Sequence, residues 1–254
     1  MKTTVITGAG SGIGRAIALR MAASGHQLAL MARGEPRLAE VAQQAKAAGA
    51  PAVATFACDI RNRDAVDQAF SAAHAALGEF TGLVANSGIG GPNADGPGDR
   101  FDDIVQTNLM GTYYCLRAAQ RHLAPGPDAR HLVAIASILG RFGVPGYTGY
   151  CASKTAILGL VRALALEVAS DGVGVNAICP GWVDTDMAWE GIDGMAEAIG
   201  VTRTEAHQIA MKQVPVGRMS QPEDVAGVVH WLMSSDAIGV TGQGIDINGG
   251  AWMG

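Results

Sequence analysis

Tyr150 and Lys154 stand four residues apart, and this spacing is the feature of the chain that bears most directly on chemistry. On a helix, side chains at i and i+4 lie on one face, so the ammonium of Lys154 can approach the same group as the phenol of Tyr150. A free phenol has a pKa near ~10 and is a poor base at neutral pH. A fixed positive charge favours the phenolate, so we expect Lys154 to lower the pKa of Tyr150. Such a pair suits proton transfer to a carbonyl oxygen or from an alcohol.

A glycine-rich segment near the start of the chain is the second chemical feature. Gly8, Gly12 and Gly14 lie between a predicted strand and a predicted helix, spaced as Gly-x-x-x-Gly-x-Gly. Glycines there permit a tight turn and close approach of a pyrophosphate, and the helix start adds N–H donors and partial positive charge. The common dinucleotide fingerprint has a different spacing, so the glycines alone are also compatible with an ordinary turn. A dinucleotide at this turn would supply the hydride that complements a proton from Tyr150.

The elements that must position these residues follow from short apolar runs that alternate with longer amphipathic stretches. Strands are predicted at residues 4–7, 27–31, 52–57, 83–85, 131–136, 173–178 and 244–247, and helices at 12–24, 36–48, 63–77, 101–124, 150–169 and 222–233. Strands separated by helices imply right-handed βαβ crossovers. We expect an α/β fold in a single domain over residues 1–254, a Rossmann-type doubly wound parallel sheet with helices on both faces. The least regular stretch, 184–215, is predicted to be a substrate lid.

Composition excludes several classes of partner. The net charge is −5 with no basic block, which favours neither a nucleic acid nor an anionic membrane surface as partner. No apolar run reaches the roughly 18 to 20 residues of a membrane span, and the immediate start of a strand leaves no room for a signal peptide. The cysteines and histidines show no metal-ligand spacing, so we expect no metal and reduced thiols in a cytoplasmic protein. The cysteines are Cys58, Cys115, Cys151 and Cys179.

Taken together, the motifs resemble those of the short-chain dehydrogenase/reductase family over essentially the whole chain. The matching residues are the glycine turn, Cys58-Asp59-Ile60, Asn86-Ser87-Gly88, the set Asn108, Ser137, Tyr150 and Lys154, and the run from Pro180 to Thr185. The family usually reads Asn-Asn-Ala-Gly at the third of these motifs. Ala85 and Ser87 depart from that pattern, whereas Asn86 matches its second asparagine.

The resemblance implies a role for each catalytic candidate. Tyr150 is the general acid in reduction and the base in oxidation, and Ser137 donates a hydrogen bond to the carbonyl oxygen. Lys154 lowers the pKa of Tyr150 and binds the ribose hydroxyls of the nicotinamide half. Asn108 holds a water that links Lys154 to solvent.

The resemblance also implies a nicotinamide cofactor. Asp59 would hold the adenine amino group, and residues 180–185 would hold the nicotinamide amide. An acidic residue at the end of the second strand would select NAD(H), but this chain has Ala32 followed by Arg33, a good phosphate ligand, so we expect NADP(H) to be preferred and NAD(H) to remain possible. Alternatively, Arg33 is only a solvated loop residue. The predicted cofactor-binding residues are Gly8, Ser11, Gly12, Ile13, Gly14, Arg33, Asp59, Ile60, Asn86, Gly88, Tyr150, Lys154, Pro180, Gly181, Val183 and Thr185.

The predicted substrate pocket is apolar with a polar catalytic end, which suits a ketone on a hydrophobic or acyl skeleton. Its predicted residues are Ser137, Leu139, Val144, Tyr147, Tyr150, Trp182 and Met187. Leu139 and Met187 could equally be core residues, and the loop at 89–92 is expected to be flexible.

Residues 32–35, 214–218 and 221–226 resemble those of 3-oxoacyl-carrier-protein reductases and aromatic-polyketide ketoreductases. The expected partner is therefore a small-molecule or acyl-thioester carbonyl substrate. Two alternatives remain: an NAD-dependent secondary-alcohol dehydrogenase and a non-catalytic dinucleotide-sensing regulator. The resemblance further implies a homotetramer.

Overall fold

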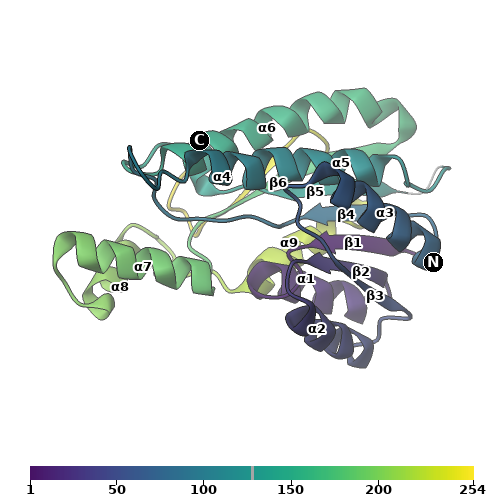
Figure 1. Cartoon of the computed structure of the whole chain (residues 1–254), viewed down its shortest axis with the longest axis horizontal. Helices are drawn as coiled ribbons and strands as arrows, with labels where there is room; N and C mark the ends of the chain where they lie inside the picture. Colours follow the sequence, from purple (N-terminus) through teal and green to yellow (C-terminus); the bar gives the residue numbers. More distant parts are fainter. Residues whose placement is uncertain (127–128) are drawn as a thin grey trace.

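The fold is built on one parallel sheet with the strand order β3-β2-β1-β4-β5-β6-β7 (Figure 1). The structure is a computed structural model that describes residues 1–126 and 129–254. The strands are β1 (Thr3–Thr7), β2 (Gln27–Ala32), β3 (Val53–Ala57), β4 (Gly82–Ala85), β5 (Arg130–Ile135), β6 (Val173–Pro180) and β7 (Gly244–Ile247). The order reverses between β1 and β4, so the loops after these two strands diverge and leave a crevice at the carboxyl edge of the sheet.

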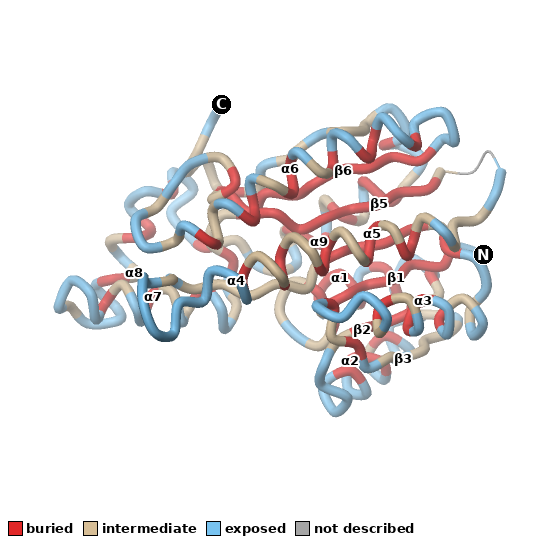
Figure 2. Tube along the Cα trace, turned by 45° about the horizontal axis from the view of Figure 1, so that its top comes forward, coloured by how far each residue is buried: buried red, intermediate tan, exposed pale blue. Residues whose placement is uncertain are grey.

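Helices cover both faces of the sheet. One face carries α1 (Gly12–Ala23), α2 (Glu35–Ala47) and α9 (Pro222–Leu232), and the other carries α3 (Arg63–Leu77), α5 (Thr112–Gln120) and α6 (Thr148–Val168). An apolar cluster fills each interface, and the central strands form the buried centre of the molecule in Figure 2. Because both of their faces are covered, β1 and β6 are buried at every residue and carry no charged side chain. The predicted doubly wound α/β fold is confirmed.

The helix predicted over residues 101–124 is present over residues 101–120, but its winding changes along its length. It consists of α4 (Phe101–Val105), a π-helical turn (Gln106–Gly111) and α5. Gly111 lies directly on Ile60, and a Cβ at position 111 would stand only 2.6 Å from the Cδ1 atom of Ile60. The predicted helix is therefore confirmed over residues 101–120, whereas apolar periodicity does not report the wider winding by which the helix passes the end of β3. Such π-turns are frequent at functional sites, and this one carries Asn108.

The stretch expected to be least regular contains two helices, α7 (Asp186–Ile199) and α8 (Arg203–Lys212). This α7–α8 segment, residues 184–215, projects beyond the end of the sheet and has an apolar cluster of its own (Figure 1). The side chain of Thr185 caps α7, and Thr202 caps α8 in a capping box with Glu205. The expectation of irregular structure is wrong because the capping residues, and not the overall composition, signal where these helices begin.

Within the described residues, no helix has the length and apolar character needed to cross a membrane. The four cysteines are unpaired there. Burial raises the pKa of the Cys58 and Cys179 thiols to about 11, so both stay protonated and unreactive at neutral pH.

Candidate active site

The four catalytic candidates meet at the carboxyl edge of the sheet. Tyr150 and Lys154 occupy the first turns of α6, Ser137 follows β5, and Asn108 lies in the π-turn. Gly88, after β4, is the point where two of them converge: a Cβ there would stand 3.1 Å from Asn108 Oδ1 and 3.5 Å from Lys154 Nζ. Any side chain at this position would intrude between those polar groups, which gives the glycine of the Asn86-Ser87-Gly88 motif its physical reason.

Lys154 is an almost completely buried cation, with 5% of its surface exposed. Its Nζ atom donates a 2.9 Å hydrogen bond to the carbonyl oxygen of Ile135 at the end of β5. Burial removes water from the ammonium and lowers the pKa of Lys154 to about 8. The amine is therefore held in place by the backbone and is mostly charged at neutral pH.

The pKa of Tyr150 is shifted in the direction opposite to the expected one. Burial raises the pKa of the Tyr150 phenol above its usual value, while a hydrogen bond from Ser137 lowers it by a smaller amount. Lys154 is not among the groups that shift the pKa, although its ammonium lies 5.6 Å from the centre of the Tyr150 ring. The structure therefore does not show the expected lowering of the Tyr150 pKa by Lys154, because loss of hydration is the largest effect on the phenol and raises its pKa. The hydroxyl of Ser137 also accepts a 3.1 Å hydrogen bond from the backbone N–H of Leu139.

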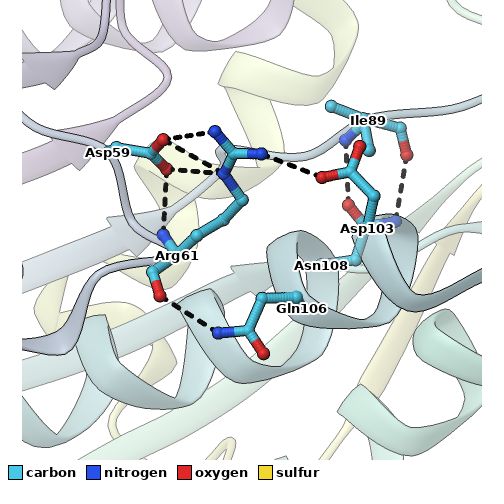
Figure 3. Close-up of polar contacts among 6 residues, drawn as sticks. All are labelled: Asp59, Arg61, Ile89, Asp103, Gln106 and Asn108. Atoms are coloured by element: carbon cyan, nitrogen blue, oxygen red, sulfur yellow. Dashed lines mark hydrogen bonds and ion pairs between the residues drawn. The ribbon is translucent and has the colours of Figure 1, made fainter. Parts of the chain in front are cut away.

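The side chain of Asn108 is fully buried and holds the loop after β4. Its Oδ1 accepts a 2.8 Å hydrogen bond from the N–H of Ile89, and its Nδ2 donates to the carbonyl oxygen of Ile89 at 3.0 Å (Figure 3). The Nδ2 group also donates to Ser153 Oγ at 3.2 Å. Both amide hydrogens are therefore used within the protein, so a water could bond to Asn108 only through an oxygen. The water relay stays a prediction.

The glycine turn has the shape of a phosphate cradle. Gly8 and Gly12 have positive φ values of 65° and 50°, and a Cβ on Gly14 would stand 2.2 Å from the carbonyl oxygen of Gly8. The amide of Asn86 donates to the carbonyl oxygens of Thr7 and Gly8 and supports the turn from the neighbouring strand. Ser11 stands at the N-cap of α1 with no side-chain capping bond among the described residues. The backbone, the hydroxyl and the helix start together fit a dinucleotide pyrophosphate.

At the end of the cleft expected to hold adenosine, Asp59 is already engaged in an ion pair. The carboxylate of Asp59 is paired with Arg61, with an Nη2–Oδ2 distance of 2.6 Å, and Arg61 also bonds Asp103 of α4 at 2.9 Å (Figure 3). The hydrogen bonds from Arg61 lower the pKa of Asp59, and the charge of Arg33 lowers it further. Arg33 and Asp59 thus flank one site, but sequence reasoning missed Arg61, whose Asp-x-Arg spacing was the available signal.

A further cation missed from the sequence lies beside the glycine turn. The Cβ atom of Arg37, in the first turn of α2, stands 3.3 Å from the Cβ position of Gly10. Its helix begins two residues after Arg33, so both arginines belong to the stretch that leads from β2 into α2. The Arg-x-x-x-Arg spacing at a helix start could have indicated Arg37.

The segment from Pro180 to Thr185 closes the cleft from the other side. The N–H of Gly181 donates to the carbonyl oxygen of Ile247 at 2.9 Å, and Thr185 Cγ2 stands 3.1 Å from the Cβ position of Gly12. The side chains of Val183 and Ile60 lie in the apolar core, so these two predicted cofactor residues can face a ligand only through their backbone. The remaining predicted cofactor residue, Ile13, is half-buried at the start of α1.

At the substrate end, Met187 of α7 lies against the loop after β4. Its sulfur stands 3.0 Å from the Cβ position of Gly90, and 43% of the residue is exposed. Leu139 and Val144 are half-buried, and Leu139, like Met187, lies outside the apolar core clusters. The charge of Tyr147 contributes to the raised pKa of Tyr150, which places the two phenols close together. These side chains fit a partly apolar wall beside Tyr150.

The tryptophans of this region hold the α7–α8 segment together. The ring of Trp182 approaches the Cβ position of Gly191 at 3.3 Å, within the cluster of that segment, so its contact with a substrate stays a prediction. Trp189 donates from Nε1 to Asp184 at 2.7 Å and stacks on His207. A surface hollow of about 430 Å³ is lined by Trp189, Arg203, Thr204 and His207. That lining includes none of the four catalytic candidates.

Comparisons with known proteins agree with this geometry. The family described as "Enoyl-(Acyl carrier protein) reductase" matches residues 8–251. A short-chain dehydrogenase/reductase of Armillaria gallica is 35% identical over 253 residues, covering 98% of this chain and 95% of that protein. The 3-oxoacyl-[acyl-carrier-protein] reductase MabA of Mycobacterium tuberculosis is 32% identical, covering 100% and 94%. The crystal structure of F189W actinorhodin polyketide ketoreductase with NADPH has a TM-score of 0.91 at 33% identity, covering 98% of this chain and 97% of that one. No group of residues suited to a metal ion occurs among those described.

Proposed function

Because this chain belongs to the short-chain dehydrogenase/reductase family and is an oxidoreductase, we propose that it reduces a ketone to a secondary alcohol with NADPH. The proposed substrate is a β-ketoacyl thioester or another ketone on an apolar skeleton. The convergence of half-buried Tyr150 with the buried residues Ser137 and Lys154 carries the proposal. The names of two similar proteins, a 3-oxoacyl-[acyl-carrier-protein] reductase and a polyketide ketoreductase, support a carbonyl substrate.

In the proposed reaction, the residues of this chain handle the proton. A nicotinamide ring held between the glycine turn and residues 180–185 would supply the hydride to the carbonyl carbon. The hydroxyl of Tyr150 gives its proton to the carbonyl oxygen, which Ser137 holds by a hydrogen bond. The raised pKa keeps Tyr150 protonated at neutral pH, as an acid requires, and the ammonium of Lys154 is proposed to bind the ribose hydroxyls of the nicotinamide half.

The choice of NADPH is supported by charge at the adenosine end of the cleft. Arg33 and Arg37 flank the site, and both guanidinium groups can bind a ribose phosphate, whereas no acidic residue ends β2. Asp59 stands beside them, paired with Arg61, and is proposed to contact the adenine amino group from that fixed position.

The decisive experiment measures oxidation of NADPH by the purified protein with an acetoacetyl thioester and with simple ketones of increasing length. A crotonyl thioester tests C=C reduction in place of C=O reduction. Tyr150→Phe keeps the ring but removes the acid, so kcat should fall by roughly 100- to 10,000-fold while NADPH still binds.

Tyr113→Phe, on α5, is the matched control and should keep the activity. Retained turnover in Tyr150→Phe would remove that residue from the mechanism. Activity with NAD and secondary alcohols alone would favour a dehydrogenase, and binding of NADPH without turnover would favour a sensor.

A further inference from the structure

The loop after β4 connects two parts of the active site. Two hydrogen bonds with the side chain of Asn108 hold Ile89 in place, and Gly90 lies against Met187. Residues 89–92, expected to be flexible, run from this anchor to a second one at Asn93. The two anchors therefore decide where the loop lies between the π-turn and α6.

Asn93 is bonded to the start of the helix that carries Tyr150. Its Oδ1 accepts a 2.9 Å hydrogen bond from the N–H of Gly149, and its Nδ2 donates to Thr148 Oγ1 at 3.0 Å. Thr148 returns a hydrogen bond to Oδ1 at 3.2 Å, and the backbone N–H of Asn93 donates to the carbonyl oxygen of Gly146 at 2.8 Å. One side chain thus binds two consecutive residues at the first turn of α6.

Helix α6 has no cap of its own. Tyr147 occupies the N-cap position and makes no side-chain capping bond, and the first turn carries no acidic residue. The first backbone N–H groups of a helix have no partner within it and need an outside acceptor. Asn93 supplies that acceptor from 56 residues away in the sequence. The start of α6 is also tightly packed, since a Cβ on Gly149 would stand 3.2 Å from the Cα of Phe101.

We infer that Asn93 is a positioning residue for catalysis: it caps α6 from the loop after β4 and so fixes Tyr150. This inference rests on the proposed role of Tyr150 as general acid. Tyr150 lies within the capped first turn, whereas Lys154 lies one turn later and is fastened independently to Ile135. Loss of the cap would let the first turn fray and move the phenol relative to Lys154 and Ser137, while the cofactor site would remain intact.

The test compares Asn93→Leu with Asn93→Asp. Leucine is similar in size but cannot cap, so kcat for ketone reduction should fall by about five- to tenfold, with little change in the Kd for NADPH. Aspartate keeps the acceptor for the N–H of Gly149 and should restore most of kcat. Thr148→Val removes the hydroxyl arm alone and should have a smaller effect than Asn93→Leu.

Asn62→Leu is the matched control, because Asn62 caps α3 with a 3.1 Å hydrogen bond from the N–H of Ala65. It should lower stability as Asn93→Leu does, but leave kcat unchanged. Hydrogen exchange of the amides at 148–151 should rise in Asn93→Leu and return towards the wild-type rate in Asn93→Asp.

The outcomes separate this inference from the proposed function. Wild-type kcat in Asn93→Leu, or equal loss in Asn93→Leu and Asn93→Asp, would overturn the role of Asn93 and leave ketone reduction standing. If the wild type reduces no ketone, the proposed function fails. Hydrogen exchange still tests whether Asn93 caps α6 in that case. Unchanged exchange of the amides at 148–151 in Asn93→Leu would refute the cap.

Discussion

At the scale of residues, burial decides the protonation of the catalytic pair. Tyr150 and Lys154 lose water together, which raises the pKa of the phenol and lowers that of the amine to about 8. Both shifts favour the neutral forms. At neutral pH the phenol therefore keeps its proton, and the amine still keeps most of its charge because its pKa of about 8 lies above that pH. This state is ready for reduction, in which Tyr150 must give a proton away.

Also at this scale, Arg33 is expected to select the cofactor. In Arg33→Ala, the Kd for NADPH should rise by about 10- to 100-fold through loss of charge-assisted hydrogen bonds, while the Kd for NADH stays unchanged. Titration of intrinsic fluorescence with each cofactor measures both constants. Lys46→Ala, in the last turn of α2, is the control for the removal of a positive charge elsewhere in the region that follows β2. Equal weakening of NADPH and NADH binding would show that Arg33 does not read the phosphate.

At the scale of elements, the site depends on how helices pass the ends of strands. The π-turn gives Asn108 its inward position because Gly111 allows close contact with Ile60, whose carbonyl oxygen stands 3.0 Å from the Cβ position of the glycine. The same turn holds Ile89, and the loop beyond it caps α6. The π-turn, the loop after β4 and α6 are therefore connected by successive contacts. A change in the winding at Gly111 should consequently displace the catalytic groups.

Gly111→Ala tests this connection. The added methyl group would overlap Ile60, so the free energy of unfolding should fall by about 1 to 3 kcal/mol and kcat should fall with it. Gly227→Ala, on α9, is the opposite case, because open space surrounds its Cβ position. That variant should gain about 0.5 to 1 kcal/mol and keep its kcat. Denaturant unfolding and steady-state kinetics measure both effects, and an unchanged kcat in Gly111→Ala would separate the π-turn from catalysis.

At the scale of the whole molecule, buried histidines make stability depend on pH at the edge of the sheet opposite the site. His26 is 5% exposed, its Nδ1 lies 2.8 Å from Thr4 Oγ1, and burial lowers its pKa to about 4, with smaller contributions from Lys2 and His230. The unfolded chain, with an ordinary histidine pKa near ~6.5, binds more protons than the folded one between these values. Stability is therefore complete above the unfolded pKa and is lost as the pH falls through this window.

The expected loss from His26 is about 2 kcal/mol between roughly pH 7 and pH 5, from the linkage between pKa shifts and stability. Urea unfolding at both pH values measures this loss. In His26→Asn, whose side chain cannot titrate, the fall in the free energy of unfolding between the two pH values should be smaller by that amount. The same fall in the wild type and in His26→Asn would contradict the role of His26 in this pH dependence.

Exposed apolar residues bear on the assembly of the molecule. The outer face of α6 exposes Leu166, and the C-terminus exposes Met253, which leaves apolar surface for a partner subunit to cover. The homotetramer stays a prediction.

The sequence by itself determined the fold class, the glycine turn and the pairing of Tyr150 with Lys154. These depend on local spacing, which the repeat of a helix or strand converts directly into position.

Only the tertiary structure decided what depends on residues distant in the chain. It paired Asn93 with Gly149, placed Arg61 between Asp59 and Asp103, and wound residues 106–111 around Ile60. It also reversed the expected pKa shift of Tyr150. Burial and contact across the sheet are properties of packing, and spacing along the chain does not contain them.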